Sequence, residues 1–323
     1  MKIIVTGGSG FLGRHVVREL EARGHDVISW SGTSSPGGAH DLRYGDFGDA
    51  GGSGFEWTER WNDPAEIVVH LAASCGGIQA NIERPADFFA DNLLMGINVM
   101  RAAVEAKAKV IMMGTVCSYP RHFTTAFHPR DLWSGYPEPT NAPYGIAKRA
   151  LLTGLHAFRD QYGLRGAYVI PANLYGPGDH FDHRSHVIPA LVKRFVDAQD
   201  NGDKEVVCWG SGSQKREFLH VRDCARGIAD ICENGDFDGE VVHFGTRQVV
   251  SIRAAAKNIA RAVGFKPFTR VKWDGSMPEG QWARELSTAR PRYINKWHHR
   301  IGMTEGIAEV VADYRERKAK GTV

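Results

Sequence analysis

The sequence predicts an α/β protein built on a doubly wound parallel sheet, with a smaller C-terminal α/β domain. Short apolar runs typical of buried strands alternate with segments whose apolar residues recur at helical spacing, and a glycine-rich loop joins the first strand to the first helix. After about residue 172 prolines interrupt the pattern and the elements become shorter. We therefore expect a first domain over residues 1–172 and a second over 173–323, with some exchange of chain between them.

The expected elements follow from apolar spacing and from the residues that stop it. Leu12, Val16 and Leu20 recur at helical spacing before Gly24, which is typical of a helix end. Residues 31–54, rich in Gly, Ser and Asp, are expected to form mostly loop. The same reasoning gives strands over 3–5, 27–28, 67–71, 110–113, 167–170, 206–209, 241–244 and 270–273, and helices over 11–23, 86–106, 143–162, 187–198, 221–233, 251–263 and 304–318.

Composition narrows the function classes. The formal charge of +3 over 323 residues is too balanced to favour nucleic acid or a membrane surface as the main partner. Five cysteines without a CxxC pair argue against a disulfide framework and a structural metal site, so a reducing compartment fits. Because no apolar stretch is long enough to cross a bilayer and no signal peptide precedes the first strand, we expect a cytoplasmic protein. From the cysteine pattern we expect no metal.

The glycine loop predicts a dinucleotide site. Gly7, Gly10 and Gly13 have G-x-x-G-x-x-G spacing between a predicted strand and a predicted helix, the arrangement of a Rossmann fold. Glycines let the backbone approach a pyrophosphate, whose charge is stabilised by the N–H groups at the start of the helix. We expect Phe11 and Leu12, at that start, to contact the cofactor too. A glycine-rich turn that only packs helix on strand is the alternative.

The end of the second predicted strand favours NADP(H) over NAD(H). NAD-binding folds usually carry Asp or Glu here for the ribose hydroxyls, whereas this chain reads Ser29-Trp30-Ser31 and has no carboxylate until Asp41. Arg14, just after the last glycine, can pair with a 2′-phosphate, or it is a solvated helix residue. Asp46 is expected to lie near the adenine.

Tyr144 and Lys148 are four residues apart and share one face of a predicted helix. A cation beside a phenol favours the phenolate, so we expect Lys148 to lower the pKa of Tyr144. Such a tyrosine can protonate a carbonyl oxygen as hydride arrives, and Lys148 can also reach the nicotinamide ribose. Thr115, at the carboxyl end of a predicted strand, supplies a hydroxyl to hold the substrate oxygen. The alternatives are a chance pair on a surface helix and a simple strand-end hydrogen bond.

Together, these three elements resemble the extended short-chain dehydrogenases/reductases, and longer strings resemble one family among them, the GDP-L-fucose synthases. The resemblance covers roughly residues 1–265. It rests on His70-Leu71-Ala72-Ala73, Gly76-Gly77-Ile78-Gln79-Ala80-Asn81, Cys117-Ser118-Tyr119-Pro120, Asn173-Leu174-Tyr175-Gly176-Pro177, Ser185-His186-Val187-Ile188-Pro189, and Trp209-Gly210-Ser211-Gly212 with Arg216-Glu217-Phe218.

The resemblance implies an NADPH-dependent enzyme that epimerises C3 and C5 of GDP-4-keto-6-deoxy-D-mannose and then reduces C4 to give GDP-L-fucose. Protons beside a ketone are acidic, and inverting those carbons requires a base on one face and an acid on the other. By resemblance Cys117 is the base and His186 is the acid. An ordinary buried cysteine and a histidine that caps or packs a helix end are the alternatives.

The resemblance also implies binding residues and an assembly. Leu71 and Ala72 would border the cofactor. The second domain would mainly bind substrate, and the family commonly forms homodimers through the two long helices beside the Tyr-Lys pair. The substrate would contact Asn173, His186, Arg194, Trp209 and Arg216, because arginine suits phosphate oxygens and tryptophan offers apolar surface. Solvated arginines and a core tryptophan are the alternatives.

Three departures from the family leave the exact sugar open. Thr115 stands where the family has serine, residues 41–61 are unusually glycine-rich, and residues 274–287 lack the family's Pro-Arg-Lys and following Asp. The alternatives are a GDP-4-keto-dideoxyhexose or GDP-4-keto-heptose epimerase/reductase, a C4 reductase alone, or a C3/C5 epimerase alone. A 4,6-dehydratase would need an acidic pair after Thr115, where Val116 and Cys117 stand. A non-enzymatic NADP-sensing regulator would typically lose the Tyr-Lys pair, which this chain keeps.

Overall fold

The computed structural model describes residues 1–31, 42, 65–122, 126–182, 185–276, 280–287, 292–294 and 296–323. Its main sheet has six parallel strands in the order β2-β1-β3-β4-β5-β9. These strands are β1 (Lys2–Thr6), β2 (Asp26–Trp30), β3 (Ile67–His70), β4 (Lys109–Met113), β5 (Gly166–Pro171) and β9 (Asp238–Phe244). The predicted doubly wound parallel sheet is therefore confirmed.

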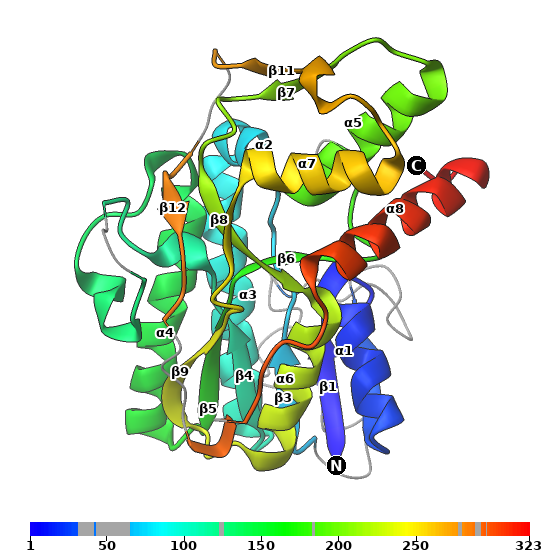
Figure 1. The fold of residues 1–323 in the computed structure, drawn as a ribbon. Helices are drawn as coiled ribbons and strands as arrows, with labels where there is room; N and C mark the ends of the chain where they lie inside the picture. The colour runs from blue at the N-terminus through cyan, green and yellow to red at the C-terminus, as the bar shows by residue number, and fades with distance from the viewer. Residues whose placement is uncertain are drawn as a thin grey trace.

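Helices cover this sheet on its two faces (Figure 1). Figure 1 shows α1 beside α6, and α3 runs beside α4. Their bounds are α1 (Phe11–Ala22), α3 (Pro85–Glu105), α4 (Ala142–Tyr162) and α6 (Val221–Asn234). Since parallel strands buried on both faces need apolar residues throughout, β3 and β5 are buried along their whole length.

The second half of the chain forms smaller sheets and a separate apolar cluster. One sheet joins β6 (Asn173–Tyr175), β8 (Lys215–His220), β10 (Val249–Ser251) and β12 (Ala283–Arg284), and another pairs β7 (Val206–Trp209) with β11 (Val271–Asp274). The helices are α2 (Ile78–Glu83), α5 (Val187–Asn201), α7 (Ile252–Val263) and α8 (Met303–Ala319), with 3-10 turns at η1 (Val116–Ser118), η2 (Pro129–Trp133), η3 (Pro139–Asn141), η4 (Phe268–Arg270) and η5 (Arg292–Ile294).

The predicted strands and helices are present, with ends shifted by a few residues. The short elements α2, β6, β8, β10 and β12 were not predicted. β9 comes from the second half but completes the first sheet, and the buried apolar residues of the described ranges fall into two clusters. The domain boundary at residue 172 stays a prediction. Except for Ser31 and Leu42, the predicted loop over 31–54 lies outside the described residues, and so does Asp46.

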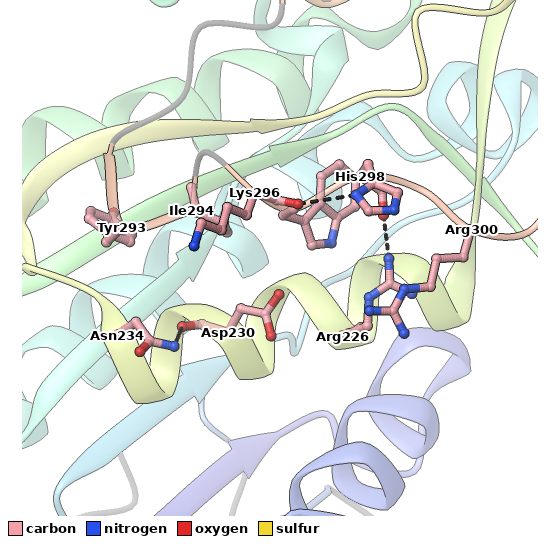
Figure 2. A pocket seen from close by; sticks show the side chains of 9 residues that line it. Arg226, Asp230, Asn234, Tyr293, Ile294, Lys296, His298 and Arg300 are labelled. Atoms are coloured by element: carbon pink, nitrogen blue, oxygen red, sulfur yellow. Dashed lines mark hydrogen bonds between the residues drawn. The ribbon is translucent and has the colours of Figure 1, made fainter.

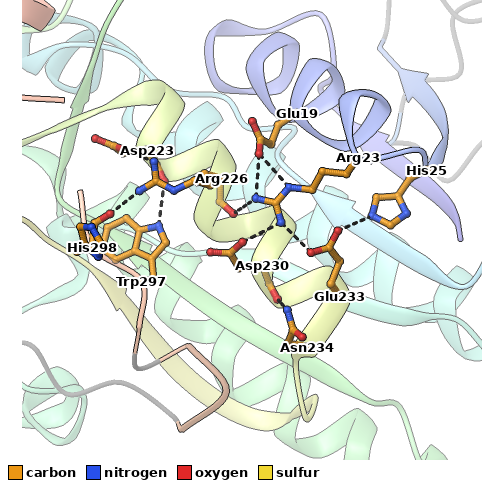
Figure 3. A network of polar contacts seen from close by, with 10 residues as sticks. All are labelled: Glu19, Arg23, His25, Asp223, Arg226, Asp230, Glu233, Asn234, Trp297 and His298. Carbon is orange, nitrogen blue, oxygen red and sulfur yellow. Dashed lines mark hydrogen bonds and ion pairs between the residues drawn. The ribbon is translucent and has the colours of Figure 1, made fainter. Parts of the chain in front are cut away.

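An ion-pair network joins the two helices on one face of the sheet (Figure 3). Arg23, just after α1, contacts Glu19 at 2.9 Å, and it contacts both Asp230 and Glu233 of α6 at 2.8 Å. His25 adds a contact of 3.1 Å to Glu233. Because Arg23, Glu19 and Asp230 are half-buried, one guanidinium keeps the three carboxylates from repelling one another.

Removing that guanidinium is expected to destabilise the fold. Arg23→Met keeps the apolar stem but leaves the carboxylates of α1 and α6 unpaired, so we expect a loss of about 1–2 kcal/mol, between the values for exposed and buried pairs. Urea denaturation would measure this as a lower midpoint. Arg130→Met is the matched control, because that side chain is 81% exposed and lies 3.9 Å from Asp131. Equal midpoints for the two variants would contradict the prediction.

Candidate active site at the carboxyl ends of the strands

The glycine loop leaves β1 and enters α1 with the geometry a dinucleotide needs. Gly7 has a φ of 72°, and a Cβ on it would lie 2.7 Å from the backbone nitrogen of Ala72. A Cβ on Gly13 would lie 2.0 Å from the carbonyl oxygen of Gly7. The start of α1 has no side-chain cap and no carboxylate in its first turn. Its free N–H groups therefore suit a pyrophosphate, and the site fits the predicted cofactor.

The other predicted cofactor residues surround this loop. Leu71 donates its N–H to the carbonyl of Thr6 at 3.1 Å, so the chain after β3 runs against the loop. Phe11 and Leu12 open α1 and are half-buried. Arg14 donates from Nη2 to the carbonyl of Ser9 at 3.1 Å and from Nε to that of Gly10 at 3.2 Å. These two bonds hold the guanidinium against the glycine loop.

Tyr144 and Thr115 lie side by side, and their hydroxyls are hydrogen-bonded. The Nζ of Lys148 lies 6.0 Å from the centre of the Tyr144 ring. Burial, followed by the nearby thiols of Cys75 and Cys117, raises the pKa of Tyr144 well above its usual range. Burial also lowers the pKa of Lys148 to about 8. The expectation that Lys148 would lower the pKa of Tyr144 was wrong, because both groups lie where desolvation outweighs their attraction.

Cys117 belongs to the same cluster. It lies in η1, directly after β4, and its backbone N–H donates to Thr115 Oγ1 at 3.2 Å. Helix α4 approaches this turn so closely that a Cβ on Gly145 would lie 2.5 Å from the carbonyl oxygen of Cys117. The glycine beside Tyr144 therefore brings the thiol and the phenol together.

An arginine that was not predicted contacts the thiol. Arg284 Nη1 lies 3.2 Å from Cys117 Sγ. Arg284 is on β12, which pairs in parallel with β8 and places Arg284 opposite Arg216. This strand falls within residues 274–287, the segment that departs from the family pattern. The sequence offered no signal, because the two partners are 167 residues apart and β12 has two residues.

A buried carboxylate holds this segment in place. Glu217 accepts backbone N–H groups from Thr246, from Arg247 at 2.6 Å and from Leu286 at 2.9 Å. Leu286 also forms a bridge with Phe127. The end of the segment is thus fixed to β8 from one side and to the loop after η1 from the other.

Two of the predicted substrate residues lie on this sheet. Arg216 is buried, and burial, followed by repulsion from Arg284, lowers the pKa of its guanidinium to about 9. Cys117 and Glu138 act in the opposite direction. Asn173 lies on β6 and donates its amide to the carbonyl of Glu217 at 2.9 Å. Arg216 thus lies within electrostatic range of Cys117, whereas the amide of Asn173 is engaged in joining two strands.

His186 approaches from a separate segment. It precedes α5 and is exposed, without capping the helix through its side chain. A Cβ on Gly77 would lie 2.9 Å from the carbonyl oxygen of the adjacent Ser185, so the loop that also contains Cys75 reaches this segment. Burial raises the pKa of Asp179, and the nearby charge of His186 opposes that rise. Asp179 is therefore a neighbour of His186 that was not predicted.

Arg194 and Trp209 form a pair of their own between α5 and β7. The guanidinium carbon lies 5.5 Å from the centre of the indole ring, and Nη1 donates to the carbonyl of Val207 at 2.6 Å. Trp209 is half-exposed. An arginine laid over an exposed tryptophan leaves a flat surface and a charge available to a ligand.

A pocket lies at the end of the sheet opposite the candidate site (Figure 2). It is lined by three residues of α6 and six from near the end of the chain: Arg226, Asp230, Asn234, Tyr293, Ile294, Lys296, Trp297, His298 and Arg300. Asn234 ends α6 shortly before β9 begins, so the pocket is at the amino ends of the parallel strands. Ligands of doubly wound sheets bind beyond the carboxyl ends, so this pocket is not part of the candidate site.

Within the described ranges, no group of three or more His, Cys, Asp or Glu side chains is arranged to hold a metal ion. In that same part of the chain, no helix is both long and apolar enough to span a membrane.

The fold and site define a class of protein. A family model described as the NAD dependent epimerase/dehydratase family matches residues 3–245. The chain is 37% identical over 253 residues to a probable GDP-L-fucose synthase 1 of Oryza sativa subsp. japonica, covering 77% of this chain and 76% of that protein. It is 34% identical over 327 residues to the GDP-L-fucose synthase of Escherichia coli (strain K12), covering 98% and 97%. The chain belongs to the GDP-L-fucose synthase family within that class.

A solved structure agrees with the fold. A GDP-L-fucose synthetase from Naegleria fowleri, bound to NADP, superposes with a TM-score of 0.80 at 24% identity. The match covers 100% of this chain and 96% of that chain. The likeness extends over both halves of the molecule, so the smaller sheets belong to the shared architecture.

Proposed function

We propose that this chain is an NADPH-dependent epimerase and reductase that converts GDP-4-keto-6-deoxy-D-mannose to GDP-L-fucose. The observation that carries the proposal is the cluster of Thr115, Cys117, Tyr144 and Lys148 beyond the carboxyl end of β4, beside the glycine loop. That cluster holds Tyr144, which can donate a proton to a ketone oxygen, together with Cys117, whose thiol can act as a base on the adjacent carbon. The names of the relatives support the choice of sugar nucleotide.

Epimerisation needs the ketone and two proton carriers. Cys117 as thiolate takes the proton from C3 or C5, and the electron pair of that C–H bond moves onto the ketone oxygen. The hydroxyls of Thr115 and Tyr144 hold that oxygen as its charge grows. His186 then returns a proton to the opposite face of the carbon, and the ketone is restored. The exposure of His186 suits a group that exchanges protons with water.

Reduction uses the same oxygen. Bound NADPH would supply the hydride for C4, and Tyr144 gives its proton to the C4 oxygen. The raised pKa of Tyr144 keeps the phenol protonated until it is needed. Lys148, one helical turn away, would hold the cofactor ribose and stabilises the phenolate that forms.

NADPH oxidation across a panel of GDP-4-keto sugars, with product configuration read by NMR, tests the proposal. We expect turnover with the 6-deoxy-manno ketone and inversion at both C3 and C5. Turnover without inversion would identify a plain C4 reductase. Preference for a heptose or dideoxyhexose ketone would change the sugar but keep the chemistry.

NADPH is expected to bind at least about tenfold more tightly than NADH, because a charged hydrogen bond to the 2′-phosphate contributes roughly 1.5–3 kcal/mol. Arg14→Ala should weaken NADPH and leave NADH nearly unchanged. Fluorescence titration of both cofactors measures this. Arg18→Ala is the matched control, since Arg18 is exposed one turn further along α1. A preference for NADH, or equal effects of the two variants, would contradict the prediction.

We also propose a cytoplasmic homodimer that pairs through α3 and α4. Support comes from the large apolar side chains that these helices expose, Phe89 and Leu94 on α3 and Tyr162 on α4. An interface would bury them. Light scattering coupled to gel filtration would give twice the chain mass, and a monomer at micromolar concentration would exclude the dimer.

A further inference from the structure

We propose that Arg284 is a positioning residue for the base, and that its guanidinium holds the Cys117 sulfur and stabilises the thiolate. The role in epimerisation rests on the proposed function. The contact itself rests on geometry and can be measured without any substrate. Nothing in the family resemblance assigns a role to Arg284, because the segment that carries it departs from the family pattern.

Arg284 is fixed on the sulfur by a chain of hydrogen bonds. While Nη1 lies 3.2 Å from Cys117 Sγ, Nε donates to Gln281 Oε1 at 3.1 Å. The amide of Gln281 in turn donates to the carbonyls of Pro120 and Arg121, both at 3.0 Å. Those two residues follow Cys117 on the same loop. The loop that carries the Cys117 thiol therefore also positions the Arg284 guanidinium.

The buried positive charge of Arg284 would be stabilised by an anion beside its guanidinium. Its side chain is 8% exposed, and in the described part of the chain it forms no ion pair with a carboxylate. Arg216, equally buried, repels it. Burying a cation without a counter-charge is costly. The sulfur in contact with Arg284 supplies that counter-charge when Cys117 loses its proton.

The same contact also affects how readily Cys117 gives up the proton that it has taken. As the thiolate takes a proton from carbon, the sulfur becomes neutral and the negative charge moves to the ketone oxygen near Tyr144. Arg284 loses its anion at that moment, which favours release of the proton from sulfur and a new cycle. An arginine that bound only the substrate phosphates would have no such effect on the thiol.

Alkylation by iodoacetamide tests the contact, because only the thiolate reacts. The rate at each cysteine is followed by peptide mass spectrometry across pH. We expect Arg284→Gln to slow alkylation of Cys117 about tenfold near neutral pH and to move its half-maximal rate to higher pH. Arg284→Lys keeps the charge and should stay within about threefold of the parent protein. Exposed Cys75 is the internal control, and its profile should not change.

Arg121→Gln is the matched control, since it removes an exposed cation from the same loop and should leave Cys117 unaffected. The proposal is overturned if Arg284→Gln alkylates at the parent rate. It is also overturned if Cys117 loses its reactivity in Arg284→Lys as fully as in Arg284→Gln, since the role of Arg284 would then be packing. If Arg284→Gln fails to fold, loss of Cys117 reactivity in a folded Arg284→Lys variant overturns the proposal by itself. Absence of keto-sugar turnover in the parent protein would defeat the proposed function alone.

Discussion

Tyr144→Phe is expected to lower ketone reduction by about 10²–10⁴-fold while NADPH binding is unchanged, because only the proton donor is lost. The ring remains to fill its buried place, and Lys148 remains to hold the cofactor. Single-turnover NADPH oxidation measures the loss, and cofactor titration measures binding. Tyr136→Phe is the control, since that phenol is exposed. Near-parental turnover by Tyr144→Phe would remove the tyrosine from the mechanism.

Cys117→Ser and His186→Asn are expected to stop solvent deuterium from entering C3 and C5, with losses of about 10²–10⁴-fold in exchange rate. Each variant removes one of the two proton carriers but leaves Tyr144 in place. Slow reduction without inversion should survive in both. Tyr144→Phe should do the reverse and allow deuterium entry without net reduction. Incubation in D₂O followed by NMR and mass spectrometry measures both quantities.

A second thiol makes this experiment sharper. Cys75 also lies close enough to Tyr144 to affect its pKa, so it is the other thiol near the ketone site. Cys75→Ser should exchange deuterium like the parent protein if Cys117 is the base. If Cys75→Ser stops exchange and Cys117→Ser does not, the base is Cys75. Parental exchange in both Cys117→Ser and His186→Asn would leave a C4 reductase as the better account.

The features that were predictable from sequence are those with local causes. Apolar spacing predicted α3 and α4, and glycine spacing predicted the loop before α1, because both depend on residues a few positions apart. β8 was missed because its sequence Lys215-Arg216-Glu217-Phe218-Leu219-His220 carries charges at positions that the fold buries. The buried carboxylate of Glu217 accepts backbone N–H groups from distant segments, and no local pattern reveals such partners.

The same limit applies to the site. Thr115 and Cys117 follow β4, Tyr144 and Lys148 lie on α4 before β5, and the structure brings the four residues together. Arg284 and Asp179 depend on contacts across the fold and had no signal in the sequence. The pKa of Tyr144 was misjudged because its direction depends on burial, and spacing on a helix gives the neighbour but not the solvent.

The position of β9 limits how the molecule can be divided. A fragment ending at residue 172 would keep the glycine loop and the Tyr-Lys pair but would expose β5, all of whose residues are buried, as an open edge. Unpaired apolar edges recruit other strands, so such a fragment is expected to aggregate. A soluble cofactor-binding fragment would have to carry residues 221–244 as well, joined to the first part by a linker in place of the intervening chain.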